Sequence, residues 1–202
     1  MRLGSFPTPL EAMPAYGVLA GHHRLYIKRD DLTGLAMGGN KVRHLEFELG
    51  EALRQDADVV LVAGGLQSNY CRAAAAASAK LGLECVILHN DHPPESVQGN
   101  QLLNHILGAH QVFLGPVSET ERGGRLEELA AQLRGEGRRP YVVRLSPLGS
   151  LGYVNAAFEL HQQALQQGIC LRHVVMVGAM AGSATGLLYG TALLAHEFHV
   201  HV

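Results

Sequence analysis

The stretch Gly38-Gly39-Asn40-Lys41 lies between a strand-like run at 25–29 and a helix-like run that begins near Asn40. Two glycines allow the backbone to turn tightly and to come close to a ligand. A lysine then stands at the helix start, beside unpaired N–H groups and the positive end of the helix dipole. This setting disfavours the ammonium form, so Lys41 is a candidate nucleophile towards a carbonyl group. The alternative is a surface lysine after a glycine turn.

Short apolar runs alternate with helix-like runs along the rest of the chain. The expected strands are 25–29, 58–63, 84–88, 111–114, 141–145, 173–177 and 198–202. The expected helices are 40–55, 68–81, 96–107, 118–134, 151–166 and 182–195. Phe6-Pro7-Thr8-Pro9-Leu10 should be extended, because its two prolines exclude a regular strand or helix. The alternation predicts an α/β fold with a parallel sheet covered by helices on both faces.

The composition is that of a soluble globular protein: 202 residues, 47% apolar, 17% charged, with net charge −2. The basic residues form no stripe, which argues against nucleic acid as a partner. Cys71, Cys85 and Cys170 form no C-x-x-C pair and indicate reduced thiols in the cytoplasm. The N-terminus lacks the apolar run of a signal peptide. The uncharged stretch 174–195 has the length of a membrane helix, but its β-branched start and glycine turn favour a buried strand, a loop and a helix.

Two glycine-rich stretches follow predicted strands and open predicted helices. Gly64-Gly65-Leu66-Gln67-Ser68-Asn69-Tyr70 suits an anion or a ring hydroxyl, although its polar side chains can equally be plain helix caps. The small residues of Gly178–Gly186 would let backbone N–H groups surround a phosphate, or would serve only close helix packing. The second stretch has neither the Walker A nor the G-x-G-x-x-G pattern, so a dinucleotide-dependent oxidoreductase is a distant third hypothesis.

The histidines near the end of the chain favour no metal site. His196-Glu197-Phe198-His199 is one residue short of H-E-x-x-H. On a final strand, His199 and His201 would face away from Phe198, Val200 and Val202 and towards solvent. No metal is therefore expected.

The motifs Phe6-Pro-Thr-Pro-Leu10, Lys28-Arg-Asp-Asp-Leu32, Gly38-Gly-Asn-Lys41 and Gln67-Ser-Asn69, in this order, resemble the D-cysteine desulfhydrase / 1-aminocyclopropane-1-carboxylate deaminase family. The resemblance implies a pyridoxal 5'-phosphate enzyme of the two-domain tryptophan-synthase-β-like fold (fold type II), with the larger domain incomplete. Residues 1–43 and 154–202 would form the larger domain and 44–153 the smaller βαβ domain, with the cofactor between them.

The same resemblance implies roles for individual residues. Lys41 would form a Schiff base with the cofactor and later move the substrate α-proton. Asn69 would hydrogen-bond the ring hydroxyl, and Ser68 would lie near the substrate carboxylate or act in ring opening. Gln67 and Tyr70 would be their neighbours at the substrate. The phosphate would be bound by the loop residues Gly178, Ala179, Met180, Ala181, Gly182 and Ser183.

The implied reaction is α,β-elimination from D-cysteine, giving pyruvate, sulfide and ammonia, in a cytoplasmic homodimer that uses a small amino acid and neither nucleic acid nor a membrane. 1-Aminocyclopropane-1-carboxylate deamination is an alternative. The phosphate loop departs from the family pattern, because Ala179, Met180, Ala181 and Ser183 replace glycine and threonine. Tyr70 replaces the usual histidine or glutamine, and family members are much longer. A truncated protein that keeps the fold without the chemistry is therefore a second hypothesis.

Overall fold

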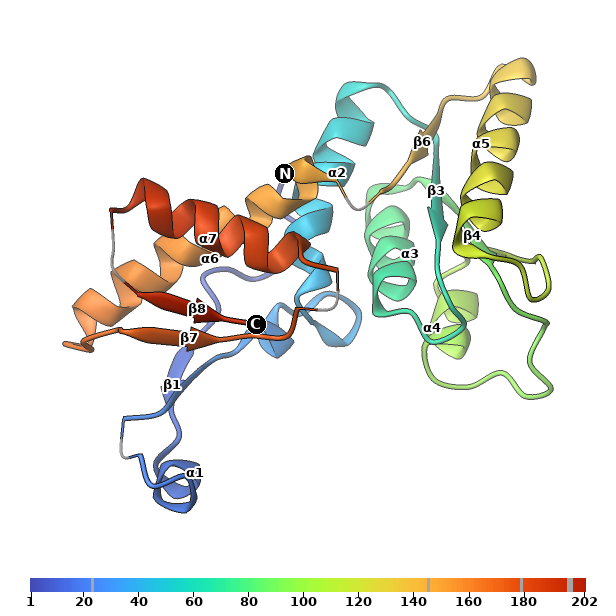
Figure 1. Cartoon of the computed structure of the whole chain (residues 1–202). Helices are drawn as coiled ribbons and strands as arrows, with labels where there is room; N and C mark the ends of the chain where they lie inside the picture. Colours follow the sequence, from blue (N-terminus) through green and yellow to red (C-terminus); the bar gives the residue numbers. More distant parts are fainter. Residues whose placement is uncertain (23, 145, 179, 196–197) are drawn as a thin grey trace. The chain divides into compact units, whose positions relative to one another are not determined.

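The computed structural model describes residues 1–22, 24–144, 146–178, 180–195 and 198–202 (Figure 1). The chain separates into two compact units, one made of Met1 and 45–144, the other of 2–44 and 145–202. The first division falls within helix α2 (Lys41–Arg54), which contributes to both. The predicted boundary at 153/154 falls inside helix α6 (Pro147–Gln166), and residues 145–153 group with the second unit. That the two units are the domains of a cofactor-binding protein stays a prediction.

The first unit contains a four-stranded parallel sheet of order β5-β4-β3-β6. Its strands are β3 (Val59–Ala63), β4 (Glu84–His89), β5 (His110–Phe113) and β6 (Pro140–Val142). Val59 is paired with Glu84 on one side and with Pro140 on the other. The central strand β3 is buried at four of its five residues, as expected for a parallel strand covered on both faces. The predicted α/β fold with a parallel sheet is thereby confirmed.

Helices α3 (Asn69–Leu81) and α5 (Glu119–Gly135) lie on opposite sides of β3 (Figure 1). Leu126 and Ala130 of α5 pack on four side chains of β3 and β4. Together these residues form the core on that face: Val59, Leu61, Val86, Leu88, Leu126 and Ala130. Both helices begin at a serine cap, Ser68 and Ser118, whose side chains accept from the N–H three residues on.

Helix α4 (Asn100–Ile106) begins four residues later than the sequence predicted. Gly99 precedes it with a φ of +59°, a conformation that interrupts a helix and that glycine adopts without strain. Residues 96–99 are therefore loop, and this places Asn100 rather than Ser96 at the start of the helix.

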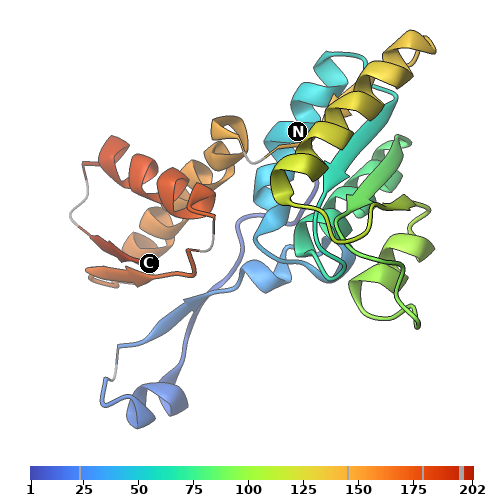
Figure 2. The ribbon, with the colours of Figure 1, turned by 45° about the vertical axis from the view of Figure 1, so that its right-hand side comes forward.

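The second unit begins with a two-stranded antiparallel ribbon, β1 (Leu10–Ala12) with β2 (Tyr26–Lys28), and α1 (Pro14–Leu19) lies at its tip (Figures 1 and 2). The sequence predicted neither β1 nor α1. Two short 3₁₀ turns, η1 (Asp30–Leu32) and η2 (Leu35–Met37), follow β2 where only loop was expected. These elements are too short for their periodicity to be recognised.

Helix α6 and helix α7 (Gly182–Leu193) lie side by side and cover a parallel pair of strands, β7 (His173–Val175) and β8 (His199–His201) (Figures 1 and 2). Tyr153, Ala157 and Leu187 form their shared core with Val174 and Val200. Within the described residues, no helix is both long and apolar enough to cross a bilayer.

Helix α6 begins at Pro147 rather than at the predicted residue 151. Ser146 accepts a hydrogen bond from the N–H of Gly149 and caps the helix, and Pro147 occupies the first position, where a missing N–H costs nothing. The Leu148–Gly152 segment is therefore helical, which brings Gly149 and Ser150 close to the first turns of α2 and α7.

Candidate functional site

The backbone of residues 30–39 fixes the start of α2. Gly38 has a φ of +71°, and a Cβ there would lie 1.9 Å from the carbonyl oxygen of Asp31. Gly39, with a φ of +112°, donates its N–H to the carbonyl of Asp30 at 3.0 Å. Both positions therefore require glycine, as predicted, and Lys41 becomes the first residue of α2.

Lys41 differs from the other two lysines of the chain. Lys28 forms an ion pair with Glu159 at 2.9 Å, and Lys80 is exposed in the last turn of α3. Lys41 is half-buried, and this burial lowers its pKa. No carboxylate forms an ion pair with it in the part of the chain that the structure describes. Burial lowers the pKa of Lys28 as well, but the amine of Lys28 is engaged by Glu159. The lowered pKa of Lys41 favours the neutral, nucleophilic form of an amine that is in no such pair within the described chain.

The first turns of α2 and α7 meet at a pair of side chains 139 residues apart. The Nε2 atom of His44 lies 2.9 Å from Oγ of Ser183, and the Asn40 amide donates to the same Oγ at 3.4 Å. His44 follows Lys41 by three residues, so both lie on one face of α2. The contact brings Lys41 close to the N-terminus of α7.

Burial, together with the charge of Lys41, lowers the pKa of His44 to about 4. The ring is therefore neutral at pH 7 and carries one proton. The backbone of Gly149 accepts a hydrogen bond from the ring. Since Nε2 faces Ser183, the proton lies on Nδ1, and Nε2 accepts the Ser183 hydroxyl. His44 thus fixes the orientation of Ser183 without adding a positive charge.

The buried neutral state of His44 predicts a pH dependence of stability. The pKa of His44 is about 4 in the folded protein and 6.5 in the unfolded chain. Its contribution to the free energy of unfolding is therefore present above pH 6.5 and is lost as the pH falls towards 4. A shift of this size corresponds to about 3 kcal/mol. Between pH 7 and pH 4, the free energy of unfolding of the cofactor-free protein, measured with urea, should therefore fall. This fall should exceed the fall in His44→Gln by about this amount. Parallel pH profiles would contradict the burial of a neutral ring.

The glycines of Gly178–Gly186 do not all serve the same purpose. A Cβ on Gly186 would lie 2.0 Å from the carbonyl oxygen of Ser150, and one on Gly178 would lie 1.8 Å from Val202. A Cβ on Gly182 would meet protein atoms only at 3.5 Å. Gly186 is therefore needed for packing, because its Cβ would meet main-chain atoms. A Cβ on Gly178 would meet only the side chain of the exposed Val202, and one on Gly182 would make ordinary van der Waals contacts with His44 and Ser150.

The other residues of this loop show what the departures from the family pattern do. Ala181 caps α7 with a φ of +57°, a left-handed conformation that costs an alanine about 1 to 2 kcal/mol. Met180 is exposed. Ser183 is buried and held by His44. Ala179 lies outside the described residues, as do His196 and Glu197 of the histidine stretch.

A buried ion cluster supports the same turn of α2. The Arg43 guanidinium is 2% exposed and donates to Asp30 at 2.8 Å, to Glu159 at 2.8 Å and to the Thr8 hydroxyl at 3.1 Å. Burial by itself would raise the pKa of Asp30, but the hydrogen bonds and charge of Arg43, together with the hydrogen bonds from Thr8 and Tyr153, outweigh it and hold this pKa below its usual value. The Tyr153 hydroxyl also donates to Asp30, at 2.9 Å. The cluster joins the N-terminal segment, α2 and α6 in one network.

The segment Gln67–Tyr70 lies in the first unit, at the start of α3. Ser68 accepts a hydrogen bond from the N–H of Cys71 at 3.3 Å, so it is a helix cap. Asn69 is exposed, and its Oδ1 accepts from the Asn100 amide at 3.0 Å. The Tyr70 hydroxyl donates to the carbonyl of Arg144 at 3.3 Å. With Oδ1 engaged by Asn100, the Nδ2 atom of Asn69 remains as the donor of this amide.

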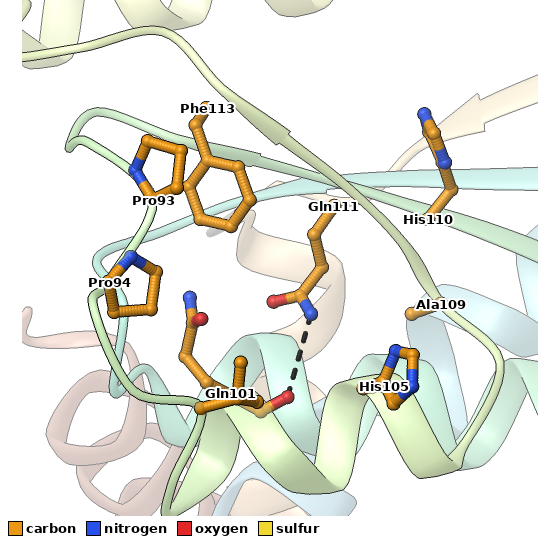
Figure 3. A pocket seen from close by; sticks show the side chains of 9 residues that line it. Pro93, Pro94, Gln101, His105, Ala109, His110, Gln111 and Phe113 are labelled. Atoms are coloured by element: carbon orange, nitrogen blue, oxygen red, sulfur yellow. Dashed lines mark hydrogen bonds between the residues drawn. The ribbon is translucent and has the colours of Figure 1, made fainter.

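The first unit also has a pocket formed by loop 93–97, α4 and β5 (Figure 3). The Gln111 amide donates to the main-chain oxygen of Gln101 at 3.5 Å within it, and the rings of Pro93, Pro94 and Phe113 lie across from that bond (Figure 3). The sequence did not predict this pocket. None of the predicted site residues lines it, so it is separate from the predicted cofactor site.

His199 and His201 project from β8 with His173 of β7 as a neighbour. His173 Nδ1 lies 3.1 Å from His201 Nε2, and all three rings are exposed. Val200 points the other way, into the core, as the strand alternation predicted. In the described ranges, no group of three or more His, Cys, Asp or Glu residues has the geometry of a metal site.

Three residues that contact the residues described above were not predicted from the sequence. His44 could have been found from its spacing to Lys41, but its contact with Ser183 could not. Arg43 gave no signal in the sequence. Asn100 could be identified only from the structure, in which it is the first residue of α4.

The model of one protein family, described as pyridoxal-phosphate dependent enzyme, matches residues 1–202. Among solved structures, the chain is similar to a 1-aminocyclopropane-1-carboxylate (ACC) deaminase homologue, with 36% identity, a TM-score of 0.88 and coverage of 98% of this chain. It is also similar in fold to Escherichia coli diaminopropionate ammonia lyase (20% identity, TM-score 0.77, coverage 98%) and to a T.th. threonine deaminase (23%, 0.74, 96%). The chain spans 60%, 56% and 57% of these three proteins, respectively.

Proposed function

Because the chain belongs to the family of pyridoxal-phosphate-dependent enzymes, we propose that Lys41 binds this cofactor covalently and that the protein acts as a lyase or deaminase on a small amino acid. The observation that carries the proposal is the setting of Lys41. It is half-buried, forms no ion pair among the described residues and stands next to the N-terminus of α7 through His44 and Ser183. An aldehyde and a phosphate on one small molecule suit these two neighbouring features.

The residues present fit the phosphate end of the cofactor. Gly182 begins a twelve-residue helix, and the N–H groups of a first helical turn have no partner within the helix and can bind an anion. The neutral His44 keeps Ser183 in place, and burial lowers the pKa of Lys41. These features support phosphate binding by Gly182, Ser183 and the backbone of Ala181.

Asn69 fits the ring end. Its oxygen is engaged by Asn100, so its Nδ2 is available to donate to the ring hydroxyl oxygen. When bound, pyridoxal phosphate supplies an electron sink that stabilises negative charge at the substrate α-carbon. Lys41, once released by the substrate, would remove the α-proton as a base with a lowered pKa. Gln67, Ser68 and Tyr70 are the proposed neighbours of the substrate carboxylate.

For the substrate, we place D-cysteine first and 1-aminocyclopropane-1-carboxylate second. Elimination from D-cysteine consumes water and releases pyruvate, sulfide and ammonia, so three products can be measured from one reaction. The purified protein, supplied with pyridoxal phosphate, should release sulfide and pyruvate in equal amounts from D-cysteine and neither product from L-serine. If the protein forms a 2-oxo acid and ammonia from 1-aminocyclopropane-1-carboxylate but no product from D-cysteine, the assignment moves to the deaminase branch.

Two glycine substitutions separate the cofactor role of the α7 turn from its packing role. Gly186→Ala should lower the free energy of unfolding by about 1 to 3 kcal/mol, because its Cβ meets the Ser150 carbonyl. Gly182→Ala should leave stability unchanged or slightly raised, because a Cβ finds ordinary contacts there. It should nevertheless weaken cofactor binding. Urea unfolding without cofactor and absorbance titration with it measure the two effects. Unchanged affinity in Gly182→Ala would contradict a phosphate site at this turn.

A second candidate function is cofactor or ligand binding without turnover. It is favoured by the left-handed Ala181 in the phosphate turn. Pyridoxal phosphate should raise the unfolding temperature of a protein that binds it. A rise without any product from either substrate would support this candidate over the enzyme.

A homodimer in the cytoplasm completes the proposal. The unpaired cysteines, two of them buried, support a reducing compartment. Val175 and Val177, which are 81% and 88% exposed at and beyond β7, support association of chains there. Sedimentation velocity at several concentrations would show whether the protein is a dimer.

A further inference from the structure

The first residue of α4 is tied to the segment that precedes α3. Asn100 donates its backbone N–H to Oε1 of Gln67 at 2.8 Å. Its side-chain Nδ2 donates to the carbonyl oxygen of Gln67 at 2.8 Å and to Oδ1 of Asn69 at 3.0 Å. Three hydrogen bonds thus connect one residue to two of the three residues Gln67-Ser68-Asn69.

The preceding glycine makes this approach possible. Gly99 has a φ of +59°, and a Cβ on it would lie 2.5 Å from Oε1 of Gln67. The Gln67 amide in turn donates to the carbonyl of Gln98 at 3.2 Å. The loop 98–100 therefore fits closely against Gln67, and any residue other than glycine at position 99 would be strained at this φ and would displace the Gln67 side-chain amide that accepts from Asn100.

The partners of Asn100 fix which way its amide points. Arg72 can only donate, and its NH1 lies 3.4 Å from Oδ1 of Asn100. The carbonyl of Gln67 can only accept, and it faces Nδ2. Both contacts require the same orientation, so Nδ2 of Asn100 is the atom that meets Asn69. Asn69 therefore accepts with its Oδ1, which leaves its own Nδ2 as a donor for another partner.

We propose that Asn100 is a positioning residue that holds the Asn69 amide with Nδ2 directed at the ring oxygen of pyridoxal phosphate. This inference rests on the proposed function, because the proposed function makes the cofactor ring oxygen the partner of the Asn69 Nδ2 atom. Without Asn100, the Asn69 amide can turn over and present Oδ1, which repels an oxygen anion. A hydrogen bond to a charged oxygen is then lost, which corresponds to a fall in cofactor affinity of about tenfold or more.

Asn100→Asp tests the inference with little change of shape. The carboxylate keeps the contact to Arg72 but cannot donate to Gln67 or Asn69. The dissociation constant for pyridoxal phosphate, from absorbance titration, should rise about tenfold. The pH midpoint at which the visible absorption band of the bound cofactor changes should also rise, because a donor to the ring oxygen anion is missing. Asn90→Asp makes the same change of charge beside Arg122 and should alter neither quantity.

A double-mutant cycle distinguishes positioning from a structural or purely electrostatic effect. In an Asn69→Ala background, Asn100→Asp should change the affinity by less than about twofold, because the amide that it orients is gone. A further tenfold loss in that background would overturn the inference and leave the proposed function intact. A wild-type protein that binds no pyridoxal phosphate would instead overturn the proposed function.

The amide orientation can also be measured without cofactor. With asparagine side chains labelled with ¹⁵N, both Nδ2 protons of Asn100 should exchange slowly with solvent, since each is hydrogen-bonded. The Nδ2 protons of Asn69 should exchange fast in the wild-type protein. In the Asn100→Asp protein, the Nδ2 protons of Asn69 should instead exchange slowly. Slow exchange of Asn69 in the wild-type protein would contradict the assignment, whatever the cofactor does.

Discussion

Lys41→Ala should abolish covalent attachment of pyridoxal phosphate, and with it the visible absorption band of the bound cofactor. Alanine has no amine to react with the aldehyde, and the other two lysines cannot replace it. Lys28 is held by Glu159 at 2.9 Å, and Lys80 lies on the exposed end of α3. Turnover should fall by about a thousandfold, because the base for the α-proton is lost with the anchor.

Borohydride makes the attachment permanent and allows its position to be read. After reduction, mass spectrometry of the wild-type digest should find the cofactor on the peptide that contains Lys41. Lys80→Ala is the matched control and should keep the band and the labelled peptide. A label on Lys28 or Lys80, or an unchanged band in Lys41→Ala, would sink the assignment.

Arg43→Met should destabilise the protein more than any of the glycine or histidine substitutions. Arg43 is 2% exposed and is shared by Asp30 and Glu159 at 2.8 Å each. Methionine fills similar volume but leaves two buried carboxylates, of which only Glu159 keeps a cation, Lys28. Breaking a buried pair by removing one partner costs about 3 to 5 kcal/mol. The urea midpoint at pH 7 should fall accordingly.

The control for this substitution is Arg54→Met on the same helix. Arg54 pairs with Glu51 at 2.6 Å, but its side chain is 73% exposed, so water replaces the pair at little cost. Its urea midpoint should stay at the wild-type value. Acidification should also restore part of the loss in Arg43→Met, because protonation removes the charges left buried. Equal midpoints for the two variants would mean that the cluster contributes nothing to stability.

Local features of the structure could be predicted from the sequence because they depend on a few neighbouring residues. Such patterns give the caps Ser68 and Ser118 and the glycine turn before Lys41. They also give the alternation of strands and helices along the first unit. The predicted starts of α4 and α6 were wrong. At α6, Ser146 and Pro147 form a competing cap, and at α4 the left-handed Gly99 interrupts the helix.

The surroundings of Lys41 were decided by tertiary packing. Gly152 of α6 approaches the backbone of Arg43, and Gly186 of α7 approaches the backbone of Ser150; a Cβ would lie 2.1 and 2.0 Å from the respective carbonyl oxygens. This close approach sets His44 against Ser183 and buries its ring, which no local pattern reports.

By itself, then, the sequence determined which lysine is the candidate and which turns surround it, because glycine and capping residues act within a few positions. Only the tertiary structure decided which partners these side chains meet: His44 contacts Ser183, Asn100 contacts Asn69, and Arg43 contacts two carboxylates. Those pairs lie 139, 31, 13 and 116 residues apart along the chain. Their contacts depend on how whole helices pack, and burial sets the charge state that each side chain keeps.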